Sequence, residues 1–91
     1  DEVVYVSAGD GATSQGDFHE ALNFSSLHCL PVIFVIQNNG WAISVPIHEQ
    51  TAGGTIIDVA KGYHGLAVSQ ADGTEYAAFS SAMAEAVERA R

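Results

Sequence analysis

Two polar clusters in this chain, Gly9-Asp10-Gly11 and Asn38-Asn39, carry side chains that could hold a metal ion. A span of 26 residues (12 to 37) separates them. The Asp10 carboxylate and the Asn39 amide offer hard oxygen ligands, which suit Mg²⁺ or Ca²⁺ better than zinc. Either cluster alone is most simply a tight turn. The two together, at this spacing, favour a metal site.

A phosphate group is the natural companion of such a metal. Gly11 and Ala12 lead into a predicted helix N-terminus, whose free N–H groups and dipole attract phosphate. The 91-residue chain has a formal net charge of −8, which argues against binding to nucleic acid or anionic lipid. A metal held by Asp10 and Asn39 would supply the positive charge that a phosphate needs. The fixed cations are few: Lys61, Arg89 and Arg91.

A strand–helix–strand unit would position both clusters. The apolar run Val3–Val6 predicts a strand buried on both faces. Ser14 and Asp17 have the spacing of a helix start, and this helix should run to about His28. Val32–Ile36 predicts a second buried strand. Ligands bind at the carboxyl ends of the strands in open α/β sheets, and both clusters follow such an end.

The second half of the chain gives weaker signals. We expect a loop at Ile47–Thr55, a short helix at Ile56–Tyr63 and a third strand at Leu66–Val68 that a turn at Asp72-Gly73 closes. An apolar stripe predicts a final helix packed on the sheet; its residues are Tyr76, Phe79, Met83 and Val87. The fold class is therefore α/β: part of a doubly wound, mostly parallel sheet, incomplete at both ends. Residues 1–91 form one fragment, with its core motif at residues 3–46.

The residues around both clusters resemble a known family. A Gly-Asp-Gly motif that ends in Asn-Asn after such a gap is typical of thiamine-diphosphate enzymes. The strings at residues 9–24 and 38–46 resemble the α subunit, or α half, of 2-oxo acid dehydrogenase E1 components. Ala12-Thr13-Ser14, with Asp17 after Gly16, is more similar to the branched-chain type than to the pyruvate type.

The resemblance implies Mg²⁺ and thiamine diphosphate as cofactors. The metal ligands would be the Asp10 carboxylate, the Asn39 amide oxygen and the backbone carbonyl of Trp41. The activity would be oxidative decarboxylation of a 2-oxo acid with acyl transfer to lipoylated E2. The partners would be an E1 β subunit or β half, E2 and the 2-oxo acid, in an oligomer without nucleic acid or membrane. No catalytic residue is assignable within these 91 residues.

The diphosphate contacts also follow from the resemblance. The amides of Gly11 and Ala12 would contact the diphosphate. Gln37 occupies the position where some relatives place an arginine that touches it; glutamine would donate a hydrogen bond there but add no charge.

The other titratable side chains favour plainer roles. We expect Cys29 to be a buried structural thiol and His19 a surface or interface residue. His28 should end the first helix, His48 should be exposed, with a substrate-facing role as the alternative, and His64 structural or exposed. The lone cysteine and short apolar runs favour a soluble, cytoplasmic protein. Two alternatives stay open: a transketolase-like or acetolactate-synthase-like thiamine enzyme, and a non-catalytic association module.

Overall fold

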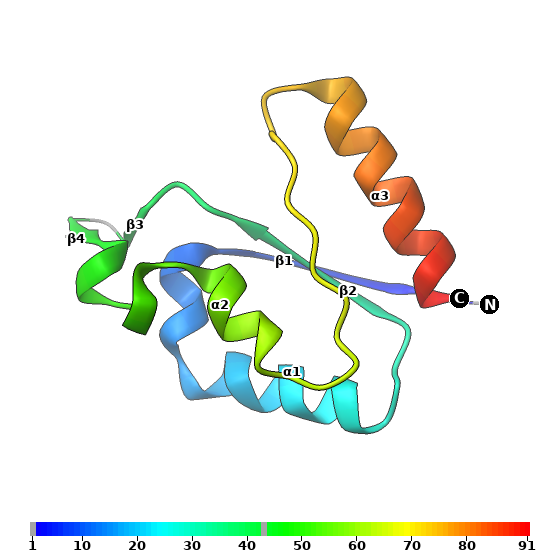
Figure 1. Ribbon diagram of the computed structural model, residues 1–91, viewed down its shortest axis with the longest axis horizontal. Coiled ribbons are helices and arrows are strands. Elements are labelled where there is room, and N and C mark those ends of the chain that lie inside the picture. Colours follow the sequence, from blue (N-terminus) through cyan, green and yellow to red (C-terminus); the bar gives the residue numbers. More distant parts are fainter. Residues whose placement is uncertain (1, 43) are drawn as a thin grey trace.

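The strand–helix–strand unit is present in the computed structural model, which describes residues 2–42 and 44–91. Strand β1 (Val4–Gly9) pairs in parallel with β2 (Val32–Gln37), and α1 (Gly16–Leu27) connects them (Figure 1). The register runs without a bulge, so Gly9 lies opposite Gln37 at the carboxyl end. Both strands therefore end at the same edge of the sheet.

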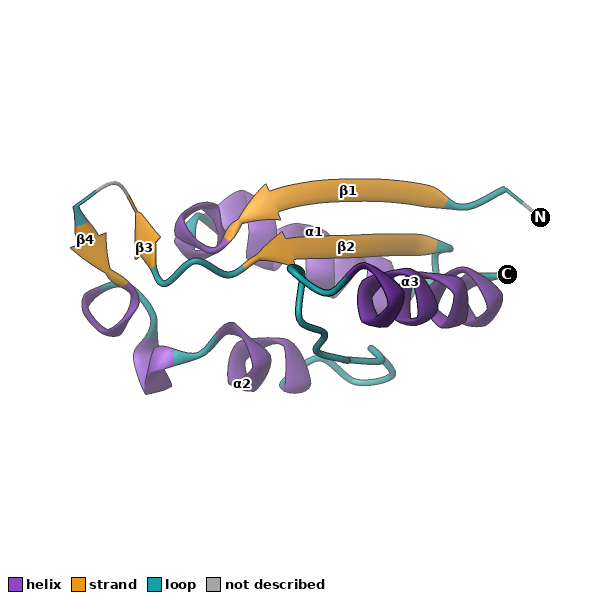
Figure 2. Cartoon of the chain, turned by 90° about the horizontal axis from the view of Figure 1, so that it is seen from above, coloured by secondary structure: helices purple, strands orange, loops and turns teal. Residues whose placement is uncertain are grey.

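A helix lies against each face of this small sheet (Figures 1 and 2). Helix α1 lies on one face and α3 (Tyr76–Ala90) on the other, while α2 (Ile56–Lys61) lies beside β2 (Figures 1 and 2). Among the described residues, the buried large apolar side chains are Leu22 and Ile56. This is an α/β fold with a two-stranded parallel sheet. A doubly wound arrangement would need further strands.

The prediction that the first strand is buried on both faces is wrong for this chain. Val4, Tyr5 and Val6 are 54%, 53% and 41% exposed. β1 pairs with β2 alone in the described sheet, so its second edge and much of its side-chain surface face solvent. A β-branched run predicts a strand, but burial depends on neighbours that the run itself does not supply.

The predicted third strand at Leu66–Val68 is also wrong. Residues 66–72 form no regular structure, because no described strand lies beside them to accept their backbone hydrogen bonds. The turn at Asp72-Gly73 is confirmed: Oδ1 of Asp72 accepts hydrogen bonds from the backbone N (2.9 Å) and the hydroxyl (2.6 Å) of Thr74. The hydroxyl first, and then the backbone N–H, lower the pKa of Asp72 below its ordinary 3.8.

Helix α1 begins later than the sequence predicts. Asp10–Ser14 forms a short 3₁₀ helix, η1, and α1 starts at Gly16 with Gln15 as its N-cap. The spacing of Ser14 and Asp17 therefore does not make a capping box, because Ser14 already belongs to η1. The predicted end is confirmed, with His28 as the C-cap.

Cys29 is exposed, which contradicts the prediction of a buried thiol. It follows the C-cap of α1 with a φ of 50°, in the left-handed region. Its N–H donates to the Ser26 carbonyl (3.4 Å), and the Leu30 N–H donates to the Ser25 carbonyl (3.0 Å). These two bonds make a Schellman motif, in which glycine usually occupies the position of Cys29. The apolar neighbours of Cys29 mark a helix end rather than the core.

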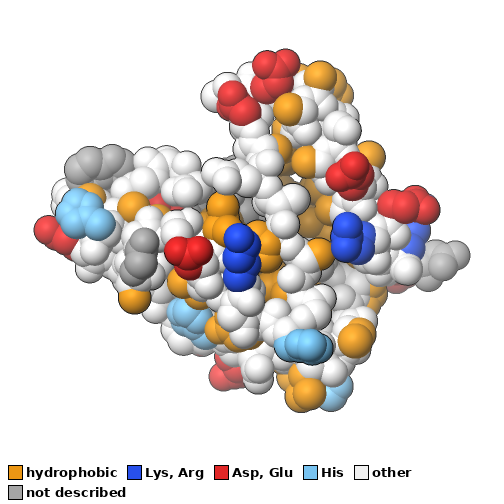
Figure 3. All heavy atoms as spheres, in the orientation of Figure 1, with side chains coloured by type: hydrophobic (Ala, Val, Ile, Leu, Met, Phe, Trp, Pro, Cys, Tyr) orange, Lys and Arg blue, Asp and Glu red, His pale blue; other side chains and the backbone are white. Residues whose placement is uncertain are grey.

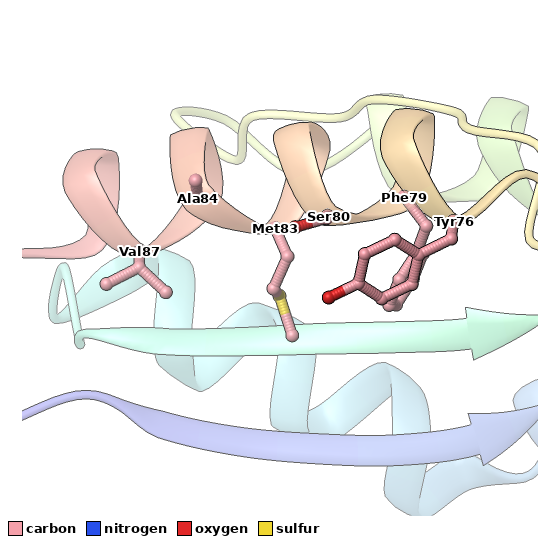
Figure 4. Close-up of a pocket in the computed structure, with 6 residues that line it drawn as sticks. All are labelled: Tyr76, Phe79, Ser80, Met83, Ala84 and Val87. Carbon is pink, nitrogen blue, oxygen red and sulfur yellow. The ribbon is translucent and has the colours of Figure 1, made fainter.

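The apolar stripe of α3 points toward β2, as predicted, but it is only partly covered. Figure 4 shows Tyr76, Phe79, Met83 and Val87 directed at the strand, and side chains of α3 alone line a shallow apolar hollow. Tyr76 is 84% exposed, and α3 buries no residue fully. The helix therefore packs on the sheet without completing a core.

A small hairpin follows the second strand, where the sequence predicts no strand. β3 (Trp41–Ala42) pairs antiparallel with β4 (Val45–Pro46). The predicted loop at 47–55 contains two 3₁₀ helices, η2 (Ile47–Glu49) and η3 (Ala52–Gly54). The short helix expected after it is confirmed as α2. Within the described ranges, the helices are too short or too polar for a membrane span.

Candidate functional site

The two polar clusters lie together at one edge of the sheet. Because Gly9 pairs with Gln37, the chain leaves both strands side by side, into Asp10 on one strand and Asn38 on the other. Figures 1 and 2 show this edge at the β3–β4 end of the molecule, opposite the two termini. The predicted meeting of the clusters is therefore confirmed.

Asp10 is the centre of this edge. Its side chain is only 1% exposed. Oδ1 accepts a hydrogen bond from the backbone N of Asn39 (3.3 Å), and Oδ2 accepts one from the backbone N of Gly40 (3.1 Å). Bonds from N–H groups to a carboxylate are among the stronger hydrogen bonds in proteins. One buried carboxylate thus ties the end of β1 to the backbone that follows β2.

Gly40 holds a left-handed backbone conformation just after β2. Its φ is +82°, a conformation that costs a residue with a side chain about 1–2 kcal/mol. Besides donating to Asp10, Gly40 accepts a hydrogen bond at its carbonyl from the Ile47 N–H (2.9 Å). The hairpin is therefore closed at its base, and residues 47–50 return toward the Asp10 loop.

Gln50 completes the link between the returning segment and the Asp10 loop. Its Nε2 donates to the carbonyl of Asp10 (2.9 Å) and to that of Gly11 (3.1 Å). The buried hydroxyl of Thr13 also donates to the Asp10 carbonyl (2.6 Å). Sequence inspection did not single out Gln50, because its partners are backbone atoms 39 and 40 residues earlier and carry no residue-type signal.

The remaining predicted site residues surround Asp10 in the chain. Gly11 and Ala12 lie in η1, directly after the carboxylate. Gln37 is the exposed last residue of β2, and Asn39 is exposed two residues later. Trp41 begins β3, and its side chain lies outside the described part of the structure. The ligand contacts of these residues stay predictions.

The donor chemistry of this edge fits a hard divalent cation. Within residues 2–42 and 44–91, no three His, Cys, Asp or Glu side chains cluster as a metal site. Asp10 contributes a carboxylate whose oxygens each have two lone pairs, and each accepts one of the backbone hydrogen bonds described above. Carboxylate, amide and carbonyl oxygens completed by phosphate oxygens are a usual Mg²⁺ environment.

The distribution of charge is also consistent with a cation beside Asp10. On the face in Figure 3, Lys and Arg side chains lie near the middle and the C-terminal side, whereas the β3–β4 end displays His and acidic side chains. The fixed cations are in α2 and at the end of α3. A phosphate beside Asp10 would therefore need a cation that this face of the chain does not provide.

The histidines have other surroundings. His19 is half-buried, and its Nδ1 shares a hydrogen bond with the Tyr63 hydroxyl (3.0 Å), which joins α1 to the segment after α2. Its role at a surface or an interface stays a prediction. His28 caps α1 as expected. His48 and His64 are exposed, as the sequence predicts.

Known proteins are similar to this chain along its whole length. The family model described as "Dehydrogenase E1 component" matches residues 1–91. The chain is 48% identical over 91 residues to 3-methyl-2-oxobutanoate dehydrogenase subunit alpha of Mycobacterium tuberculosis, covering 100% of this chain and 24% of the relative. It is 45% identical over 91 residues to 2-oxoisovalerate dehydrogenase subunit alpha of Bacillus subtilis, covering 100% of this chain and 27% of the relative.

The pyruvate type is similar to nearly the same degree. The identity to the pyruvate dehydrogenase E1 component subunit alpha of Bacillus subtilis is 47% over 90 residues, covering 97% of this chain and 24% of the relative. The chain spans about a quarter of the length of these relatives. Because the family model matches every residue from 1 to 91, the chain belongs to the dehydrogenase E1 component family.

Proposed function

We propose that this segment anchors the diphosphate of thiamine diphosphate, through Mg²⁺, in the α part of a 2-oxo acid dehydrogenase E1 component. The observation that carries the proposal is the buried Asp10 carboxylate, bonded to the backbone of Asn39 and Gly40 where the two strands end. A carboxylate bonded to the backbone of Asn39, at the edge of the sheet where α/β proteins bind their ligands, supports a site for a hard cation.

Each residue of the site has a proposed role. Asp10, the Asn39 amide oxygen and the Trp41 carbonyl hold the metal. The N–H groups of Gly11 and Ala12 bind the diphosphate. Gln37, exposed at the end of β2, adds a neutral hydrogen bond.

The whole enzyme's chemistry needs more than this segment. Bound thiamine diphosphate supplies an electron sink for decarboxylation of a 2-oxo acid, while the protein binds and orients it. We assign no catalytic residue to residues 1–91. The proposed partners are an E1 β subunit or β half and a lipoylated E2, and the proposed location is cytoplasmic. A branched-chain 2-oxo acid is our preferred substrate, because the string after Asp10 is more similar to that type.

Metal dependence is the property that tests the site. Diphosphate beside a buried carboxylate in a chain of net charge −8 is electrostatically unfavourable unless a cation lies between them. Calorimetric titration of the full-length protein, purified with its β partner, should therefore show thiamine diphosphate binding with Mg²⁺ and little without it.

A matched pair of variants assigns this dependence to Asp10. Asp10→Asn keeps the shape but removes the charge, and should weaken Mg²⁺-dependent binding about a hundredfold or more, the usual scale for a lost metal ligand or its support. Asp58→Asn makes the same change at an exposed position of α2 and should bind like the wild type. Equal affinity in Asp10→Asn and the wild type would contradict the proposal and favour a non-catalytic association module.

A further inference from the structure

The side chain of Gln50 makes an unusual pair of contacts with the loop that follows β1. One nitrogen, Nε2, donates to two successive backbone carbonyls, those of Asp10 (2.9 Å) and Gly11 (3.1 Å). A primary amide has two N–H donors on that nitrogen, so one side chain can satisfy both carbonyls. Gln50 is half-buried and follows directly after η2. It therefore fixes the orientation of two adjacent peptide units from the side of the hairpin.

The geometry of the peptide bond transmits this orientation to two N–H groups. The Asp10 carbonyl shares its planar unit with the Gly11 N–H, and the Gly11 carbonyl shares its unit with the Ala12 N–H. In a trans peptide the C=O and N–H point in opposite directions. Because Gln50 holds both carbonyls toward itself, the N–H groups of Gly11 and Ala12 are directed away from it. Those are the two amides that we propose bind the diphosphate.

Gln50 is itself held in place by the same network. The Asp10 carboxylate accepts the Gly40 N–H, and the Gly40 carbonyl accepts the Ile47 N–H (2.9 Å). Ile47 then accepts at its carbonyl the N–H groups of Gln50 (3.0 Å) and Thr51 (2.8 Å). Hydrogen bonds thus run from the Asp10 side chain through the hairpin and back to the Asp10 backbone. One closed network of hydrogen bonds therefore positions both the Asp10 carboxylate, which we propose binds the metal, and the backbone after it, which we propose binds the diphosphate.

We infer that Gln50 is a positioning residue for the diphosphate: it presets the peptide units of Asp10–Gly11 and Gly11–Ala12 so that their N–H groups face the ligand. This role presupposes the proposed cofactor site and adds a determinant of cofactor affinity. Preset donors bind more tightly than donors that must be ordered on binding, so the loss of Gln50 should appear in affinity for the cofactor.

The test compares two replacements of nearly the same size in the full-length protein with its β partner. Gln50→Met removes both donors, and Gln50→Glu replaces the amide nitrogen by an oxygen that repels the carbonyls. We expect the KM for thiamine diphosphate, at saturating Mg²⁺, to rise about tenfold in Gln50→Met, the scale of two neutral hydrogen bonds, and further in Gln50→Glu. The kcat at saturating cofactor should stay near the wild-type value. Gln70→Glu, in the exposed segment after α2, controls for the added charge.

The outcomes separate this role from a general structural one and from the proposed function. If either variant loses stability and active fraction while its cofactor KM stays at the wild-type value, Gln50 only supports the fold and the inference fails. If the wild type binds thiamine diphosphate with Mg²⁺ and both variants bind it equally well, the inference fails alone. If the wild type shows no Mg²⁺-dependent binding, the proposed function fails and this role of Gln50 fails with it.

Discussion

Replacing Gly40 by alanine should destabilise the protein through backbone strain alone. The φ of Gly40 is +82°, and an added Cβ would meet no atom within 4 Å. Steric overlap is therefore absent, and what remains is the cost of the left-handed conformation, about 1–2 kcal/mol. Alanine also loses less entropy on folding than glycine, which returns about 0.4–1 kcal/mol. The net loss should be on the order of 1 kcal/mol.

Gly16→Ala is the matched control for this change. Gly16 begins α1 without a left-handed φ, and a Cβ there would also meet nothing within 4 Å. Because the entropy term is common to both variants, the difference between them isolates the strain, about 1–2 kcal/mol. The assay is unfolding in urea of the full-length protein, with the two variants compared under identical conditions. Equal stability of Gly40→Ala and Gly16→Ala would refute the claim that the backbone at residue 40 is conformationally constrained.

Three further changes test particular contacts. Cys29→Gly should raise the free energy of unfolding by up to about 1 kcal/mol, because glycine suits the left-handed position that ends α1. Cys29→Ala, the control, should not raise it, and the urea unfolding midpoints of the two variants provide the comparison. Tyr63→Phe should lower stability by about 1 kcal/mol through loss of the bond to His19, and an unchanged urea midpoint would mean that this bond contributes nothing. Thr74→Val should raise the pKa of Asp72 toward 3.8 in an NMR titration, because the Thr74 hydroxyl is the largest cause of its lowering. A lowered carboxyl pKa stabilises the folded state at pH values above the pKa of the unfolded chain, and this contribution is lost as the pH falls through the pKa of the folded state. The free energy of unfolding of Thr74→Val should therefore depend less on pH in the acid range.

Local patterns predict the elements that position the site, and long-range contacts decide the rest. The alternation of apolar runs and turn residues is enough to predict β1, α1 and β2, because each of these elements has a strong hydrophobic period or a clear end. It fails at Leu66–Val68, where a short apolar run lacks a described partner strand, and pairing is what makes a strand. It also fails at Cys29, where apolar neighbours suggest burial but the helix-ending motif turns the residue outward.

The candidate site shows the same division. Asp10 and Asn39 are identifiable because their side-chain chemistry and strand-end positions are written in the sequence. That Asp10 binds the backbone N–H groups of Asn39 and Gly40 is a matter of three-dimensional geometry. Gln50 leaves no mark in the sequence, since its side chain recognises carbonyl groups that every residue has.

The most direct measurement of the central claim is turnover by the full-length protein with its β partner. We would follow 2-oxo acid-dependent reduction of an artificial electron acceptor, with and without thiamine diphosphate and Mg²⁺, using pyruvate and the three branched-chain 2-oxo acids. We predict turnover that requires both cofactors, is fastest with a branched-chain acid and is abolished by Asp10→Asn. A folded complex that binds thiamine diphosphate but turns over none of these acids would contradict the account and indicate another class of thiamine enzyme.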